Sequence, residues 1–292
     1  MSSLLVSAYL QVRTLEGGHS DTVNTLAFSP NGLYLASGGD DYALIIWNVL
    51  QGRLLAVDVV IWHPVHPDTV IVGCANGTLQ QVQNFSLLHS EQHDIHLGAR
   101  STVHCLDYDT TSSRLAIGMG EEVHITREIT PNRYSGDVVL PAPPEHENIE
   151  HSPDQRLRAI TVRFHDDGAA LVVSYLAHGI ICWDTSTCEK KWQIIMPSTK
   201  PNIGGSAISP DSRSIVVYNL VDGLDLYTLG AQRKTQPKMT YKFDAPPSSR
   251  HRLQVEYIHD GHGIVCGTTT GKICVWESVT GELSQHLPHE GE

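Results

Sequence analysis

The sequence lacks the long apolar runs, the helical periodicity and the closely spaced cysteines that mark several common protein classes. No apolar run in the 292 residues approaches the roughly 20 that a transmembrane helix needs. No segment of ten or more residues places its apolar positions at helical spacing, so we expect an all-β chain. The N-terminus has no basic start and only a short apolar stretch, which indicates a strand and not a secretion signal.

Positive charge is also scarce. Lys and Arg number 20 against 32 Asp and Glu, which leaves a formal net charge of -12. A surface of this sign repels phosphate backbones and anionic lipids, so we expect neither nucleic acid nor a membrane as a partner. A basic stretch formed by Arg233, Lys234, Lys238 and Lys242 is too sparse to reverse that field and is interpreted as a solvated loop face.

The six cysteines are scattered through strand-like runs, where a thiol behaves as a small hydrophobic group. None of their spacings matches a metal-binding pair, and we interpret them as free thiols of an intracellular protein in the cytoplasm or nucleus. They are Cys74, Cys105, Cys182, Cys188, Cys266 and Cys274.

What the sequence does contain is one well-formed repeat unit. Residues 18–48 read GHSDTVNTLAFSPNGLYLASGGDDYALIIWN, with a Gly-His opening and a Trp-Asn close. Three short apolar runs lie between them, and Ser29-Pro30-Asn31-Gly32 supplies a turn after the first run. A unit of this kind cannot bury its own faces, which predicts further copies along the chain.

Weaker copies follow when the end of the first apolar run is used as a marker. Six such ends, each before a turn signal, are spaced 34 to 56 residues apart: Phe28, Trp62, Tyr108, Phe164, Ile208 and Tyr257. This spacing brackets the roughly 40–45 residues of a four-stranded blade. We therefore predict one domain over residues 1–292 with units at 16–55, 56–89, 97–140, 157–196, 203–243 and 251–288.

These features resemble the WD-repeat β-propeller family, strongly in residues 18–55 and more faintly elsewhere. The resemblance implies a β-propeller of four-stranded antiparallel blades with six recognisable repeats. It also implies a hydrogen-bonded structural tetrad in the first unit, made of His19, Ser37, Asp41 and Trp47. Ala177 and Thr270 break the tetrad in two later units. We therefore expect blade 1 to have the best-ordered polar core.

Two catalytic or metal-binding alternatives were weighed against this structural interpretation. Ser37, His19 and Asp41 are the residue types of a hydrolase triad, but Ser37 lies inside an apolar strand and not on an exposed turn. A histidine cluster could hold a metal, yet it reads as a polar loop; it comprises His89, His93, His96 and His104, with Asp94. No glycine-rich phosphate loop precedes a helix. We predict no catalytic, cofactor-binding or metal-binding residue and no enzyme activity.

Ring closure stays open between two arrangements. Residues 8–15 have the alternation of an outer strand, although the last unit already has its own at residues 282–287. In the first, six blades close the ring and one terminal strand is redundant. In the second, which we favour, a seven-bladed ring lacks three strands and has an open seam. Two long connections, residues 128–156 and 230–251, are either tolerated insertions or docking loops.

The resemblance implies an interaction scaffold or adaptor that binds other proteins or peptides on the propeller top face and blade edges. It does not specify the contacting residues or the oligomeric state. The alternative is an enzyme or small-molecule binder that uses the central channel, which requires charged residues to converge from several inner strands. The midpoints of these strands predict an inert wall instead: Asn24, Val59, Leu106, Val162, Ser206 and Val255.

Overall fold

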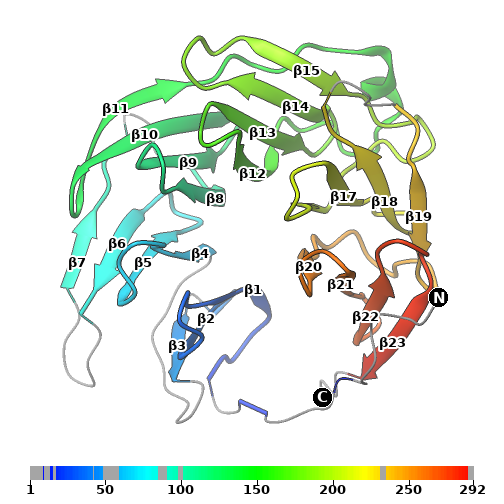
Figure 1. Cartoon of the computed structure of the whole chain (residues 1–292), viewed down its shortest axis with the longest axis horizontal. Coiled ribbons are helices and arrows are strands. Elements are labelled where there is room, and N and C mark those ends of the chain that lie inside the picture. Colours follow the sequence, from blue (N-terminus) through cyan, green and yellow to red (C-terminus); the bar gives the residue numbers. More distant parts are fainter. Residues whose placement is uncertain are drawn as a thin grey trace.

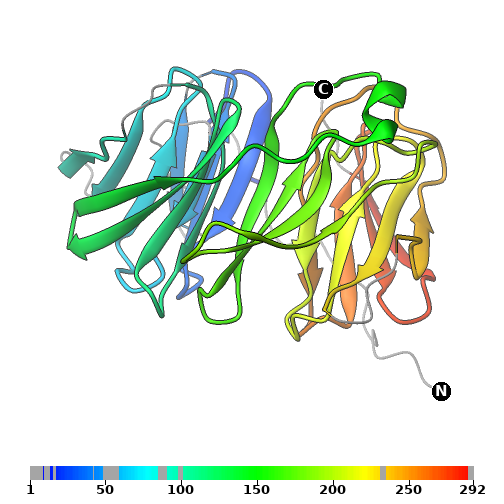
Figure 2. The same ribbon diagram turned by 90° about the horizontal axis from the view of Figure 1, so that it is seen from above.

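The structure, a computed structural model, describes residues 9, 14–15, 18–41, 43–48, 59–84, 91–97, 101–230 and 235–288. These residues form six antiparallel sheets in which consecutive strands are neighbours. The sheets are arranged around a central axis (Figure 1) and stand side by side in one layer when viewed from the edge (Figure 2). The predicted all-β fold, a six-bladed propeller, is confirmed. No helix in the described part of the chain is long and apolar enough to cross a membrane.

The first three blades lie in the N-terminal half, and each begins at the axis and proceeds outward. Blade 1 has three described strands, β1 (Val23–Phe28), β2 (Tyr34–Gly39) and β3 (Leu44–Asn48). Blade 2 contains β4 (Val59–Trp62), β5 (Thr69–Gly73), β6 (Leu79–Gln83) and β7 (Glu91–Asp94). Blade 3 contains β8 (Val103–Asp109), β9 (Arg114–Met119), β10 (Glu122–Thr130) and β11 (Arg133–Val139).

The other three blades repeat this order after a short 3₁₀ helix, η1 (Glu147–His151). Blade 4 contains β12 (Ala159–His165), β13 (Ala170–Tyr175), β14 (Gly179–Asp184) and β15 (Lys190–Ile194). Blade 5 contains β16 (Gly205–Ile208), β17 (Ser214–Tyr218), β18 (Gly223–Thr228) and β19 (Met239–Lys242). Blade 6 contains β20 (Val255–Ile258), β21 (Gly263–Gly267), β22 (Lys272–Glu277) and β23 (Leu283–Pro288).

Five apolar clusters hold neighbouring blades together. Each cluster takes residues from two consecutive blades, from blades 1 and 2 round to blades 5 and 6. The cluster between blades 3 and 4, for example, packs Ile125 against Leu171 and Trp183. Burial of apolar sheet faces at about 25 cal/mol per Å² is the main force that holds such sheets in contact. All six cysteines are free thiols, four of them buried in these layers.

Blades 6 and 1 meet differently. No apolar cluster among the described residues joins them, and Val23, Leu26 and Phe28 of β1 are 46%, 49% and 65% exposed. The Gln254 side chain instead forms two 3.3 Å hydrogen bonds with the Leu26 backbone, donating to its carbonyl and accepting from its N–H. The described residues therefore form six blades, of which blades 6 and 1 touch at their inner edge through Gln254 while the apolar side chains of β1 stay exposed. The choice between a closed six-bladed ring and an incomplete seven-bladed one stays a prediction.

Part of the predicted terminal strand, residues 8 and 10–13, lies outside the described residues. Within it, Tyr9 lies beside the outer strand of blade 6: its backbone exchanges hydrogen bonds of 2.7 and 2.9 Å with the Gln285 side chain. The Tyr9 hydroxyl is also hydrogen-bonded to the ring of His259. Tyr9 is thus linked to blade 6, although it precedes blade 1 in the sequence.

Two boundaries differ from the sequence-based units. Blade 2 extends past residue 89, because β7 pairs with β6 in the register Gln83 to Glu91. This strand reads EQHD and has no apolar alternation, so its sequence carries no strand signal. The expected long connection from residue 128 begins instead as a hairpin, since β10 runs to Thr130 and returns as β11.

Candidate functional site

The four residues of the predicted tetrad lie together in blade 1. Nε2 of His19 is 2.8 Å from Oγ of Ser37, and Nδ1 is 2.9 Å from a carboxylate oxygen of Asp41. The indole N–H of Trp47 donates to the same Ser37 oxygen at 2.7 Å. Burial raises the pKa of Asp41, but hydrogen bonds from His19 and from two backbone N–H groups outweigh it and lower that pKa overall.

This geometry satisfies polar groups and leaves no exposed nucleophile. Ser37 is 2% exposed, and its oxygen already accepts a hydrogen bond from the Trp47 indole, whereas a triad serine needs an exposed hydroxyl. The backbone at Gly18 passes close to the Trp47 ring, so that an added Cβ would lie 2.5 Å from it. Glycine therefore lets the entering chain cover the indole.

The other blades have different residues at the matching positions. In β13, Leu171 and Trp183 are paired as Leu35 and Trp47 are in blade 1, and Val173 falls where Ser37 would be. The Trp183 indole nitrogen is buried and forms no well-aligned hydrogen bond with a described residue, although it acts on the nearby Tyr175 hydroxyl, whose pKa it lowers against the larger effect of burial. Blade 4 therefore lacks the serine acceptor that blade 1 supplies.

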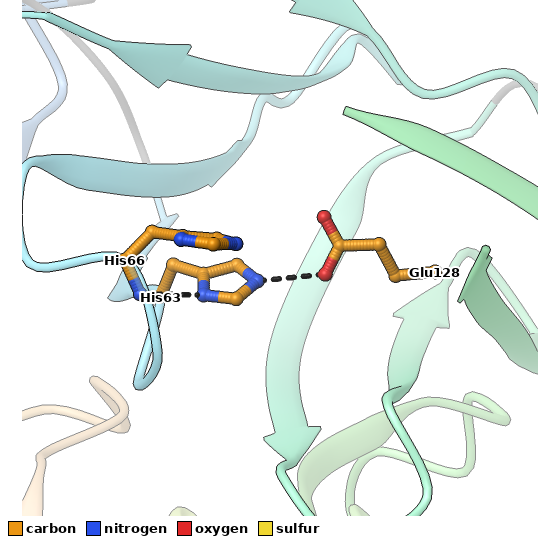
Figure 3. Close-up of side chains that lie close together, drawn as sticks. All are labelled: His63, His66 and Glu128. Carbon is orange, nitrogen blue, oxygen red and sulfur yellow. Dashed lines mark hydrogen bonds and ion pairs between the residues drawn. The ribbon is translucent and has the colours of Figure 1, made fainter. Parts of the chain in front are cut away.

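A second polar group links blades 2 and 3 through His63, His66 and Glu128 (Figure 3). His63 follows β4 and is fully buried, and its Nε2 is 2.8 Å from Glu128 of β10. The Tyr108 hydroxyl donates to the same carboxylate oxygen at 2.6 Å. Burial raises the pKa of Glu128, but the hydrogen bonds from His63 and Tyr108 outweigh it and lower that pKa to about 2.

The hydrogen bonds of His63 decide what this group can bind. Its Nδ1 accepts from the backbone N–H groups of Val65 and His66 at 3.2 and 3.1 Å. Nδ1 is therefore the unprotonated nitrogen, and Nε2 carries the proton that is donated to Glu128. With both nitrogens engaged, His63 has no free lone pair for a metal, and the group fits a polar link between two blades.

The histidines singled out in the sequence are not brought together. His89 lies outside the described residues, while His93 and Asp94 are successive residues of β7, whose side chains point to opposite faces. His96 is exposed after that strand, and His104 lies in β8 of the next blade.

Charged side chains do converge on the central axis, which corrects the expectation of an inert wall. They follow the predicted midpoints by one residue: Asp107 in β8, Arg163 in β12 and Glu256 in β20. The Arg163 guanidinium lies 3.9 Å from Asp107 and 3.6 Å from Glu256. Alternation in a strand explains the error, since Leu106 and Val162 point into the apolar clusters and their successors face the axis.

A second layer of charge lies where these inner strands begin, and we call His104, Arg158 and Arg252 the basic mouth. The charges of Arg158 and Arg252, together with burial, lower the pKa of His104 to about 4. Cys105 and Ala159, the chain neighbours of His104 and Arg158, are in contact through a 3.7 Å bond from the thiol to the carbonyl. The basic mouth lies where the inner strands begin, the end of β12 that the chain reaches from η1, and Figure 2 shows η1 as the short coil at its upper edge.

Sequence reasoning missed this layer, although a signal was present. A basic residue stands four to six positions before the end marker in three units, as His104, Arg158 and Arg252 precede Tyr108, Phe164 and Tyr257. The predicted basic stretch contributes nothing here: Lys238 and Lys242 are exposed at β19, and residues 233–234 lie outside the described part.

Comparison with known proteins gives matches to single repeats and to the whole fold. Residues 10–48 match the family model "WD domain, G-beta repeat". Among solved structures, the Cps50 (Swd1) β-propeller domain of Myceliophteria thermophila superposes with a TM-score of 0.70. That match covers 94% of this chain and 88% of the other at 17% identity, so it shows the fold alone.

Curated relatives are similar over shorter stretches. The ribosome biogenesis protein ERB1 of Ajellomyces capsulatus is 41% identical over 73 residues, which is 22% of this chain. The corresponding protein of Botryotinia fuckeliana is 30% identical over 136 residues, or 44% of this chain. The chain spans only 9% and 16% of the lengths of these two relatives.

Proposed function

Because the chain is a WD-repeat β-propeller, we propose that it is a non-catalytic scaffold that binds other proteins or peptides on its top face and blade edges. The observation that carries this proposal is the layer of charged side chains that a rigid set of six sheets presents around the axis. Preformed sites on packed strands lose little conformational entropy on binding. A protein surface is the class of ligand that such a broad, rigid face suits.

The polar groups of the described residues support a binding role over a catalytic one. The Ser37 hydroxyl, the nucleophile of the hydrolase-triad alternative, is buried and accepts a hydrogen bond from the Trp47 indole. On the axis, Arg163 is shared between Asp107 and Glu256, so the converging charges neutralise one another. An enzyme that used the axis would need an acid or base free to act on a substrate.

The relatives narrow the setting of the proposed scaffold. Their printed role is ribosome biogenesis, and the shared stretch of 73 residues is about two blades long. We place this chain in a ribonucleoprotein assembly pathway as a protein-binding component, which favours the nucleus over the cytoplasm. Fluorescence microscopy of the tagged chain tests the compartment, and a purely cytoplasmic signal would contradict it.

Site-specific photo-crosslinking in cells tests the scaffold proposal. A photoreactive residue at Ser101 or Pro153 probes the face where the inner strands begin, and one at Asp167 or Ser212 probes the opposite turns; all four positions are exposed. We expect discrete protein adducts from the first pair, each lost when the propeller is unfolded by Leu171→Asp. Equal, weak labelling from all four positions would contradict a defined binding face.

A further inference from the structure

The basic mouth is a local concentration of positive charge in an acidic protein. Two arginines, Arg158 just before β12 and Arg252 just before β20, carry positive charge there, while the chain as a whole has a net charge of -12. His104 of β8 lies beside them and is uncharged near neutral pH, because its pKa is lowered to about 4. Deeper along the axis, three to five residues further on, the layer of Asp107, Arg163 and Glu256 has two acids and one base. The axis is therefore positive at its entrance and has one more acidic than basic side chain below it.

The two arginines of the basic mouth form no ion pair or hydrogen bond with the described residues that would account for their position. Nδ1 of His104 is buried and also lacks a hydrogen-bond partner in the described part of the chain. After burial as the first cause, the charges of Arg156 and Arg252 lower the pKa of Arg158, and the charge of Arg156 lowers the pKa of Arg252. Asp154 is the nearby counter-charge that acts on Arg158, and it is already paired with Arg156. Like charges held together with so little counter-charge are costly unless a ligand neutralises them.

The backbone that carries Arg158 is held in place by buried polar contacts. The Asn202 amide, 5% exposed, donates to the carbonyls of Asp154 and Leu176 at 2.8 and 3.2 Å. Ser152 donates to the same Asp154 carbonyl at 2.6 Å. Asp154 in turn accepts two hydrogen bonds from Arg156, at 2.8 and 2.5 Å, whereas Arg158 feels the charge of this carboxylate without a hydrogen bond to it. These hydrogen bonds give the segment between η1 and β12 a defined conformation just before Arg158.

We propose that the basic mouth binds an oxyanion carried by a protein partner, a phosphorylated or carboxylate-rich peptide segment. This inference rests on the proposed scaffold function and names the chemistry of its ligand. Arg158 and Arg252 approach the oxyanion from blades 4 and 6 and donate charge-assisted hydrogen bonds, while His104 lies beside them on blade 3. Phosphate and carboxylate share this chemistry, and the peptide's main chain would lie over the face where the inner strands begin.

A peptide fits this site better than a nucleic acid. The positive charge is confined to one spot, and Asp107 and Glu256 lie directly beneath it. A continuous polyanion would need a basic track and would be repelled by a chain whose net charge is -12. A peptide with one or two oxyanions and no other charge can place them beside Arg158 and Arg252 and is otherwise little affected by the negative charge of the protein.

Fluorescence anisotropy with the full chain tests the proposal. The probes are one labelled Gly-Ser peptide with two phosphoserines, the same peptide with glutamates, the unmodified peptide, and a single-stranded RNA 12-mer. We expect both acidic peptides to bind more tightly than the unmodified peptide. Arg158→Gln and Arg252→Gln should each weaken that binding about tenfold, because a charge-assisted hydrogen bond contributes at least one such factor.

Arg133→Gln provides the matched control, because this arginine is exposed on β11 at the outer edge of blade 3. It should leave peptide affinity within about twofold, and thermal melts should show that all three variants fold. Three results would overturn the proposal: no binding of either acidic peptide to the folded protein, affinity unchanged in both mouth variants, or arginine-dependent binding of the RNA alone. Photo-crosslinked partners that persist in the double variant would reject the anionic ligand and leave the scaffold function intact.

Discussion

Blades 1 and 4 show opposite relations between motif and burial. Blade 1 has the complete polar tetrad, yet its inner strand β1 exposes four of its six residues. Blade 4 has no tetrad, yet all six residues of β13 and five of six in β14 are buried. Blade 4 has an apolar cluster on each side, whereas blade 1 has one such cluster among the described residues, the one it shares with blade 2.

The difference indicates that the motif substitutes for a missing neighbour contact. His19, Ser37, Asp41 and Trp47 link the incoming chain to β2 and β3 by hydrogen bonds, on the blade that touches blade 6 through Gln254. A blade between two apolar clusters does not need that link, since burial on both faces already orders its strands. Polar networks order a structure when every member has a partner, as in blade 1.

The largest contrast is expected from one matched pair of leucines. Leu171 and Leu35 occupy the same position, each opposite the aromatic end of the inner strand and the tryptophan of the third strand. Leu171→Ala should lower the free energy of unfolding by about 2–5 kcal/mol, since it creates a cavity in a fully buried site. Leu35→Ala should cost about half as much, because Leu35 is half-buried. Urea unfolding measures both, and equal losses would contradict the burial argument.

Removing the central hydroxyl of the tetrad should have the next largest effect. Ser37→Ala leaves Nε2 of His19 without its donor and the Trp47 indole without its acceptor, at a cost of about 1–3 kcal/mol. Trp47→Phe removes the same indole bond from the other side. If that bond matters, the double variant should lose less than the sum of the two single losses. Strict additivity would mean that the bond contributes nothing.

Acidification should loosen the two blades in different places. The folded-state pKa of Asp41 is lowered, so its stabilisation is present above the unfolded-state value of about 4 and is lost as pH falls through the lower folded value. In blade 4 the acid with a lowered pKa is Asp184, whose hydrogen bonds go to Ser186 and Thr187 in a surface turn.

Hydrogen exchange at pH 7 and near pH 3 locates the loss, after correction for intrinsic rates. Exchange should rise inside β2 and β3 of blade 1, but in blade 4 only around residues 184–189. Asp41→Asn should remove the pH dependence in blade 1 alone. A uniform rise across both blades would show that the tetrad carboxylate has no local role.

How much the sequence could predict follows from the same contrast. The ends of the inner strands were visible because turn signals follow them, and Phe28, Trp62 and Ile208 each end a strand. The polar strand β7 was missed because its pairing depends on β6 and not on its own residues. Propensity and alternation report local structure, while pairing partners are a tertiary property.

The site was less predictable than the fold. The basic mouth depends on which face of each inner strand turns to the axis, and strand phase changes with a single residue. β-Bulges in β8 and β12, at His104 and Ile160, shift that phase in a way no local pattern announces. The His63 link requires Glu128 from another blade, 65 residues away, which only the folded ring brings near.

The smallest effect is expected from moving the acceptor of blade 1 into blade 4. Val173→Thr keeps the side-chain shape and gives the buried Trp183 indole the hydroxyl acceptor that Ser37 supplies in blade 1. Burial of the hydroxyl costs about 1–3 kcal/mol, and the new hydrogen bond offsets about 1 kcal/mol or more of it. Val172→Thr is the matched control, since Val172 is equally buried but faces the cluster shared with blade 5. Urea unfolding should give Val173→Thr a free energy of unfolding near that of the parent, and Val172→Thr a clearly lower one. Equal losses would mean that the Trp183 indole forms no stabilising hydrogen bond with the new hydroxyl.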